Sequence, residues 1–387
     1  MQNTVIPMKY QSDLLVLPQD DFRTARLTAV FALPLRQENA AQYAILLGLL
    51  SRCCRKYPDR LSMSRALDRL YGADISAHSA MVGGWQVLPF SVSFLQSRYT
   101  LGHEELTQAC TDILLDMVFD PMLENGIFRE ADFRLEQRCQ IEYLEGKINN
   151  KRLYALEQCV KLLCPDHPFS ADPNGTVETV RALTAEKVTA AWKEMLATAR
   201  IHWIYQGAGD TEALIAEIER RMAQLPERQV ATTIADTSFT LKTTERTEYM
   251  ELQQAKLVLG CRIPVTEPDE KVYAARLMNS LLGGCPTSLL FRHVREEQSL
   301  CYYCSSTYDR MRGILLISSG VEAANAQKTK VEILKQLDAV RHGDFTDDEL
   351  EAARRALTQQ IAAVEETPAA RQMGYIPCLL SGKIVSP

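Results

Sequence analysis

The six histidines are the first residues to consider for chemistry, because imidazole is the most common metal ligand and general base in proteins. A zinc motif on one helix needs two histidines four residues apart, so that both side chains face the same ion. No two histidines of this chain lie within five residues of each other. They are His78, His103, His167, His202, His293 and His342. The sequence therefore contains no local two-histidine metal motif.

The eleven cysteines are scattered and odd in number, and we interpret them as reduced thiols, most of them in the core. Cys301 and Cys304 alone have the two-residue gap of a zinc knuckle. Their segment, CYYCSSTY, predicts a strand, in which residues three apart point to opposite faces. We therefore predict that this pair does not share a metal ion.

Motifs for other catalytic chemistry are also missing. The chain has no Gly-x-Ser-x-Gly segment, and no cysteine has a supporting local signature with a histidine. The Gly-Gly pairs at 83–84 and 283–284 lack the lysine-serine or spaced-glycine companions of phosphate-binding loops. We predict neither a serine or cysteine nucleophile nor a bound cofactor.

The chain contains an internal repeat. Residues 26–50 and 256–280 align without a gap at an offset of 230, so that Tyr43-Ala44 corresponds to Tyr273-Ala274. In each copy an apolar strand leads through an acidic, polar turn into an amphipathic helix.

Both copies then continue with two strands joined by a glycine-containing turn, one helix and a longer helix with acidic residues at its start. The predicted ranges are 74–94, 103–118 and from 128 onward in the first copy, and 301–319, about 325–341 and from 345 onward in the second. The unit is β-α-β-β-α-α. It predicts an α+β fold with helices packed on one face of a mainly antiparallel sheet, present twice.

The two copies end differently. The first continues into a helix and a closing strand at about residues 200–207, whereas the second ends about 40 residues before the same elements would be complete. Either the chain is truncated, which we favour, or the second sheet exposes an unpaired strand. We predict a first domain at 1–226, a linker at 227–250 and a second domain, truncated at its C-terminus, at 251–387.

Composition places the chain among ordinary globular proteins of about two domains, with 387 residues, 46% hydrophobic and 24% charged. Its net charge of -6 and the absence of long like-charge runs argue against nucleic-acid binding. The N-terminus predicts no export signal, and the longest apolar run, near residues 43–50, is far shorter than the roughly 20 residues of a membrane span. We predict a cytoplasmic protein with no membrane partner.

The segment SLLFRHVREEQSLCYYCSS, residues 288–306, resembles the insulinase/pitrilysin family of zinc metallopeptidases, which includes the mitochondrial processing peptidase subunits. In the second domain of that family, Leu-Phe-x-x-Val-Arg-Glu leads to Leu-x-Tyr, with the arginine and tyrosine seven residues apart. Here they are Arg295 and Tyr302. LYGADIS at 70–76 resembles the first-domain version of this segment. The resemblance covers nearly the whole chain.

The chain departs from the family in its first helix. Active members carry His-x-x-Glu-His there, which binds zinc and activates a water. The corresponding stretch, AILLGLLSRCCRKYPD at 44–59, has no histidine or glutamate, and Ala44, Leu47 and Gly48 fall where ligands and base would lie. The chain resembles most the YmfF-like bacterial branch, which lacks zinc. We predict that it is not an enzyme on its own, since activity would require a metal site built from dispersed histidines.

In the family the third zinc ligand is a glutamate on the long helix. Glu136, Glu142 and Glu145 lie in that helix here. With the histidines absent, we interpret these glutamates as a solvated helix face. We interpret His293 in the same way, as a surface or packing residue.

Arg295 and Tyr302 have an ordinary interpretation as a surface ion-pairing group and a packing residue of a strand. The resemblance implies instead that they bind substrate. In the family the tyrosine hydroxyl donates a hydrogen bond towards the scissile carbonyl and its developing oxyanion, and the guanidinium anchors the peptide. Such groups can act on zinc held by another subunit.

Two functions therefore stand as hypotheses. The first is a non-catalytic subunit of a heterodimeric peptidase, whose Arg295 and Tyr302 bind the peptide substrate of a zinc-bearing homologous partner. The second is a peptide- or protein-binding scaffold on an inactive peptidase fold, which the resemblance to the YmfF-like branch connects with modification of translation elongation factor P. The presence or absence of a partner with the full zinc motif distinguishes them.

Overall fold

The computed structural model describes residues 3–17, 22–165, 167–231 and 243–382. The chain forms two compact units. Unit 1 contains the described residues of Met1–Glu145, Ala171–Asp236 and Thr367–Leu379, and unit 2 those of Gly146–Ser170, Thr237–Glu366 and Leu380–Pro387. Part of the linker predicted at 227–250, residues 232–242, lies outside the described residues, as do the last five residues of the predicted second domain.

Unit 1 is built on a seven-stranded sheet in the order β1-β2-β9-β3-β6-β4, with β5 also paired to β6. All neighbours are antiparallel except β2 and β9, which are parallel. Its strands are β1 (Thr4–Met8), β2 (Ser12–Leu17), β3 (Thr24–Pro34), β4 (Asp74–Ala77), β5 (Ala80–Val82), β6 (Trp85–Leu95) and β9 (Arg200–Gln206). A separate small hairpin consists of β7 (Leu123–Glu124) and β8 (Ile127–Phe128).

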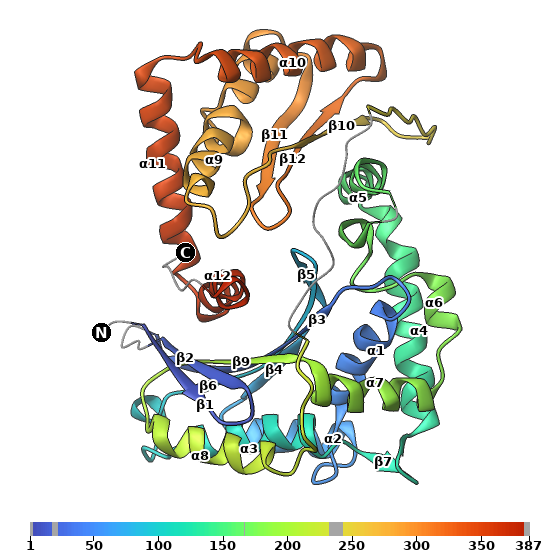
Figure 1. The fold of residues 1–387 in the computed structure, drawn as a ribbon, viewed down its shortest axis with the longest axis vertical. Coiled ribbons are helices and arrows are strands. Elements are labelled where there is room, and N and C mark those ends of the chain that lie inside the picture. Colours follow the sequence, from blue (N-terminus) through green and yellow to red (C-terminus); the bar gives the residue numbers. More distant parts are fainter. Residues whose placement is uncertain (1–2, 18–21, 166, 232–242, 383–387) are drawn as a thin grey trace. The chain divides into compact units, whose positions relative to one another are not determined.

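Helices cover one face of this sheet (Figure 1). Alternate residues of β3, including Leu27, Ala29 and Phe31, enter the main apolar core together with residues of these helices. Within residues 1–236, the helices of unit 1 are α1 (Ala40–Arg52), α2 (Arg60–Arg69), α3 (Thr107–Phe119), α4 (Glu130–Gly146), α6 (Val177–Arg181), α7 (Ala185–Thr198) and α8 (Thr211–Met222). The intervening positions of β3, among them Arg26 and Thr28, face the other side of the sheet.

That other face is covered by α12 (Pro368–Ser381), which comes from the end of the chain (Figure 1). Gln372 of α12 is buried and joins the polar residues of this face. Its side-chain oxygen accepts a hydrogen bond from the Thr28 hydroxyl, and its amide donates to the Arg26 carbonyl over 3.0 Å. The Arg26 guanidinium in turn donates to Ser76 and Ser93. The second face is therefore held by a hydrogen-bond network rather than by apolar packing alone.

Unit 2 contains the three-stranded sheet β10-β12-β11, with both pairs antiparallel. Its strands are β10 (Ala255–Arg262), β11 (Cys301–Asp309) and β12 (Ile314–Val321). Its helices are α5 (Lys151–Leu163), α9 (Lys271–Asn279), α10 (Ala326–His342) and α11 (Asp347–Val364), and its π-helical segments are η4 (Ser280–Gly284) and η5 (Leu290–Glu297). One face of the sheet packs against a core that includes Leu282, Leu290 and Ile333. The opposite face packs against α5.

The predicted α+β fold with two β-α-β-β-α-α units and a mainly antiparallel sheet is confirmed. Two features were not predicted. The hairpin of β1 and β2 extends the first sheet, and its outer strand contains Pro7, which weakens the strand signal but is tolerated at an edge. Helix α5, which follows α4 in the first repeat, and helix α12, near the end of the second repeat, each belong to the unit of the other repeat. Among the described residues of unit 2, β10 pairs with β12 alone.

The docking of α12 can be tested by Gln372→Ala. The substitution leaves the Thr28 hydroxyl and the Arg26 carbonyl without their buried partner, which we expect to lower the free energy of unfolding by about 1–3 kcal/mol. Urea unfolding followed by tryptophan fluorescence reports on unit 1, because Trp85, Trp192 and Trp203 all lie there. Gln224→Ala, at an exposed position just after α8 in the same unit, is the control. Equal midpoints for the two variants would contradict the described network.

Candidate functional site

Helix α1, where the resemblance places the family's zinc motif, is apolar throughout its middle. Ala44 and Gly48 lie four residues apart on the same half-buried side, while Leu47 is 4% exposed and packs in the core. None of the three can bind a metal or accept a proton. This helix supports the sheet, and its side chains offer no chemistry.

The carboxylate of Glu136 on α4 lies directly against Gly48. A Cβ atom at Gly48 would be 2.3 Å from Glu136 Oε2, so any larger residue there would displace this side chain. The two helices thus bring together Gly48, which the resemblance places at a ligand position, and a glutamate.

A guanidinium supplies the positive charge beside this carboxylate. Arg52, one turn after Gly48 on α1, approaches Glu136 Oε1 with Nη2 at 3.2 Å and Asp132 Oδ1 with Nε at 3.8 Å. Arg129 donates from Nε to the other oxygen of Asp132 at 2.6 Å. The side chains of Arg52 and Glu136 are only 13% and 20% exposed, so their attraction is less screened than that of a surface pair.

The prediction that Glu136, Glu142 and Glu145 form a solvated helix face is wrong for Glu136. Glu142 and Glu145 are exposed, and Glu145 makes only an exposed pair with Arg181 at 3.3 Å. Glu136 lies on the side of α4 that faces α1. Glu142, six residues later, points in another direction, because only residues three or four apart share one face of a helix. No sequence signal marked Arg52 as its partner except its position one helical turn after Gly48.

The histidines are dispersed in the fold. His202 Nδ1 lies 2.9 Å from the carboxylate of Asp13 on the neighbouring strand. His293, predicted to be a surface or packing residue, pairs with Glu297 at 2.7 Å. Burial and the charge of Arg26 lower the pKa of His78. Over the residues that the structure describes, no three His, Cys, Asp or Glu side chains gather as a metal site would require.

Arg295 and Tyr302 lie on consecutive elements of unit 2 and both remain accessible. Arg295 is near the end of η5, where its guanidinium stacks on the Phe291 ring at 4.5 Å and approaches Glu296 at 3.6 Å. Its side chain is 41% exposed. Tyr302 is the second residue of β11 and is 52% exposed, and its hydroxyl has no hydrogen-bond partner among the described residues. Both functional groups are therefore available to a ligand.

A β-bulge at the start of β11 changes the expected geometry of Cys301 and Cys304. Cys301 pairs with Val321 of β12 and Tyr303 with Gly320, so one residue is inserted between them. The extra residue brings Cys301 and Cys304 to the same face, where both contact the core of unit 2. The prediction that these two side chains point to opposite faces is wrong, because it assumed an unbroken strand.

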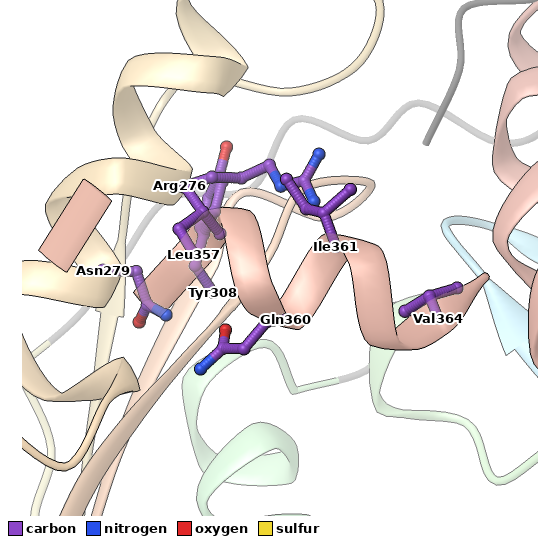
Figure 2. A pocket seen from close by; sticks show the side chains of 7 residues that line it. All are labelled: Arg276, Asn279, Tyr308, Leu357, Gln360, Ile361 and Val364. Carbon is purple, nitrogen blue, oxygen red and sulfur yellow. The ribbon is translucent and has the colours of Figure 1, made fainter. Parts of the chain in front are cut away.

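A small pocket of about 250 Å³ lies between α9, β11 and α11 (Figure 2). Apolar residues of α11 and polar groups of α9 and β11 line it, namely Leu357, Ile361, Val364, Gln360, Arg276, Asn279 and Tyr308. Asn279 and Tyr308 are engaged elsewhere, as acceptor from Ser306 and as donor to the Val265 carbonyl. Neither Arg295 nor Tyr302 lines the pocket, and sequence reasoning did not predict it.

Comparison with known sequences relates the chain to peptidase homologues. Residues 182–357 match the model of the family described as the peptidase M16 inactive domain. The chain is similar to the "Probable inactive metalloprotease YmfF" of Bacillus subtilis, with 24% identity over 91% of this chain and 83% of that protein. It is also similar to the "Uncharacterized zinc protease YmxG" of the same organism, with 24% identity over 78% and 73% of the two chains.

Solved structures show the same fold. A conserved protein from Enterococcus faecalis superposes with a TM-score of 0.88 at 24% identity, covering 99% of this chain and 91% of that one. A peptidase M16 inactive domain from Pseudomonas fluorescens gives a TM-score of 0.79 at 17% identity, covering 99% and 87%. In the described part of the chain, no helix has both the length and the apolar character needed to cross a membrane.

The ion pair between Arg52 and Glu136 predicts a measurable coupling. We expect Arg52→Ala to lower the free energy of unfolding by about 1–3 kcal/mol, because it leaves the partly buried carboxylate of Glu136 uncompensated, whereas Asp132 keeps Arg129. In a double-mutant cycle with Glu136→Ala, the two losses should be less than additive by about 1 kcal/mol.

The matched control is the exposed pair of Arg181 and Glu145, which lies in the same unit. Its cycle should give a smaller coupling, since solvent screens that pair. Tryptophan fluorescence in urea measures both cycles. A coupling between Arg52 and Glu136 no larger than that of the exposed pair would contradict the interpretation.

Proposed function

Because the chain belongs to the insulinase/pitrilysin family of zinc metallopeptidases, in the inactive YmfF-like branch without His-x-x-Glu-His, we propose that it is the non-catalytic subunit of a heterodimeric peptidase. Its partner is a homologous chain that carries the zinc motif. Arg295 and Tyr302 of this chain bind the peptide substrate, and the complex acts in the cytoplasm.

The observation that carries the proposal is a contrast between the two units. In unit 1 the positions of the zinc ligands are apolar, and Arg52 neutralises the carboxylate that remains. In unit 2 the Arg295 guanidinium and the Tyr302 hydroxyl are accessible, at the seven-residue spacing of the family's substrate-binding segment. The exposure of these two groups and their spacing support a role in peptide binding.

The chemistry of these groups suits a peptide. A guanidinium presents several N–H donors in one plane and can hold a backbone carbonyl or a terminal carboxylate. A phenol hydroxyl can donate one hydrogen bond to the carbonyl oxygen that becomes negative when water attacks. Neither group generates the attacking hydroxide, so the zinc and the general base have to come from the partner.

The second candidate is a peptide- or protein-binding scaffold, connected with modification of translation elongation factor P. The open edges of the three-stranded sheet favour it, because among the described residues β10 and β11 each pair only with β12. An extended peptide could add a strand at such an edge. In this case Arg295 and Tyr302 would contribute binding energy but no rate enhancement.

The decisive experiment mixes the purified chain with the zinc-bearing homologue of its own organism and measures peptide hydrolysis. Tyr302→Phe removes one hydrogen-bond donor to the oxyanion, and we expect it to lower kcat about 100- to 1000-fold. Arg295→Ala should raise KM for the peptide, since it removes an anchoring group.

Tyr273→Phe provides the matched control, because Tyr273 lies on α9 of the same unit and is 49% exposed, close to the value for Tyr302. It should leave kcat unchanged. Equal rates for Tyr302→Phe and Tyr273→Phe would rule out assistance to catalysis. A failure of any zinc-bearing homologue to associate with the chain would leave the scaffold as the better description.

A further inference from the structure

The guanidinium of Arg26 on β3 is half-buried and has only neutral hydrogen-bond acceptors. It lies on the face of the unit 1 sheet that carries Thr28, opposite to the main apolar core. Its Nη1 donates to the Ser93 hydroxyl at 2.6 Å and its Nη2 to the Ser76 hydroxyl at 2.9 Å. The buried Nε has no acceptor among the described residues, and no ion pair of the described chain includes Arg26. Neutral oxygens alone therefore surround this positive charge.

A guanidinium withdrawn from water is costly unless an anion accompanies it. Burial is the main influence on Arg26, and it lowers the pKa of the guanidinium. Asp74 on β4 opposes this effect, but it lies beyond Ser93 in the same row of the sheet and is exposed. Because water screens the Asp74 carboxylate, it compensates the charge of Arg26 only in part. The remaining positive charge is available to another anion.

The surrounding groups can donate to such an anion without adding a second charge. Ser76 and Ser93 each accept from Arg26 through a lone pair, so each hydroxyl can still donate its own proton. His78 directly follows β4, and partial burial together with the positive charge of Arg26 lowers its pKa, which keeps the imidazole neutral at pH 7. Since β4 is the last strand of the sheet and both serines are half-exposed, the cluster is open at the sheet edge.

We propose that Arg26, Ser76 and Ser93 form a binding site for a carboxylate, such as the acidic side chain or the C-terminus of a peptide. One uncompensated positive charge matches a monoanion, which favours a carboxylate over a doubly charged phosphate. The guanidinium forms charge-assisted hydrogen bonds to the carboxylate oxygens, and the two hydroxyls donate to their remaining lone pairs. The site belongs to unit 1 and does not rest on the proposed function, whose residues belong to unit 2.

His78 provides a reporter for the site. The full chain is titrated with sodium acetate at constant ionic strength, and the imidazole resonances are followed by NMR over a range of pH, with His78→Gln for assignment. Bound acetate offsets the positive charge of Arg26, so we expect the titration midpoint of His78 to move to higher pH. His103, exposed in the same unit, is the internal control and should not respond.

Variants of the site connect this response to named groups. Arg26→Gln should move the midpoint of His78 to higher pH without acetate and abolish the effect of acetate. Ser93→Ala removes one hydroxyl donor and should weaken acetate binding about three- to tenfold. Arg69→Gln and Ser64→Ala, at exposed positions of α2 in the same unit, are the matched controls and should change neither property.

Two peptides distinguish the sources of the carboxylate. The first is N-acetylated trialanine with a free C-terminus, and the second is an N-acetylated, C-terminally amidated tripeptide with glutamate at its centre. A response of His78 to the first alone identifies a chain terminus as the ligand. A response to the second alone identifies an acidic side chain.

Three results would overturn the proposal. The first is a midpoint of His78 that does not move with acetate in the unmodified chain, a test that needs no variant to fold. The second is an equal response to chloride, which would mean that salt screens Arg26 without a specific site. The third is tighter binding of inorganic phosphate than of acetate. No measurement involves peptide hydrolysis, so failure of this site and failure of peptidase assistance are observed separately.

Discussion

The requirement to cover both faces of each sheet governs the organisation of the chain. A sheet exposes apolar and polar side chains alternately on its two faces, and the helices that follow it within one repeat cover only one of them. Helix α12 covers the second face in unit 1, through the buried amide of Gln372. Helix α5 covers it in unit 2, where Cys159 packs so closely that a Cβ atom at Gly260 would lie 2.9 Å from its sulfur. Each repeat supplies the missing cover of the other, so neither repeat is complete as an isolated segment of sequence.

A partly buried carboxylate has to be compensated, and this requirement accounts for the contact between α1 and α4. A glutamate that is mostly buried costs several kcal/mol unless a positive charge or hydrogen bonds accompany it. Here Arg52 reaches Glu136 from the neighbouring helix and supplies that charge. Because Gly48 has no side chain, the carboxylate of Glu136 can lie directly against α1. An ion pair therefore links the two helices at a position where no side chain intervenes.

The repeat, the order of its elements and most of their boundaries could be predicted, because apolar periodicity and turn residues are local signals. Predicted strands at 74–94 and 301–319 and the acidic starts of α4 and α11 correspond to the observed elements. The packing of α5 in unit 2 and of α12 in unit 1 could not be predicted. The sequence of an amphipathic helix shows that it has a buried face but not which sheet buries that face. The pairing of Arg52 with Glu136 depends on the distance between two helices 84 residues apart in sequence, which no pattern along the chain encodes.

The bulge at Cys301 links features that the sequence presents as separate. In an unbroken strand Tyr302 and Tyr303 would simply alternate between two packed faces. With the inserted residue, Tyr303 is held between Arg152 and Lys256 and against Gly320, whereas Tyr302 is turned outward. The same insertion brings the side chains of Cys301 and Cys304 to one face of the sheet. Exposure of the tyrosine and proximity of the two sulfurs thus have one geometric cause. Any change that straightens this strand should therefore bury Tyr302 and separate the thiols together.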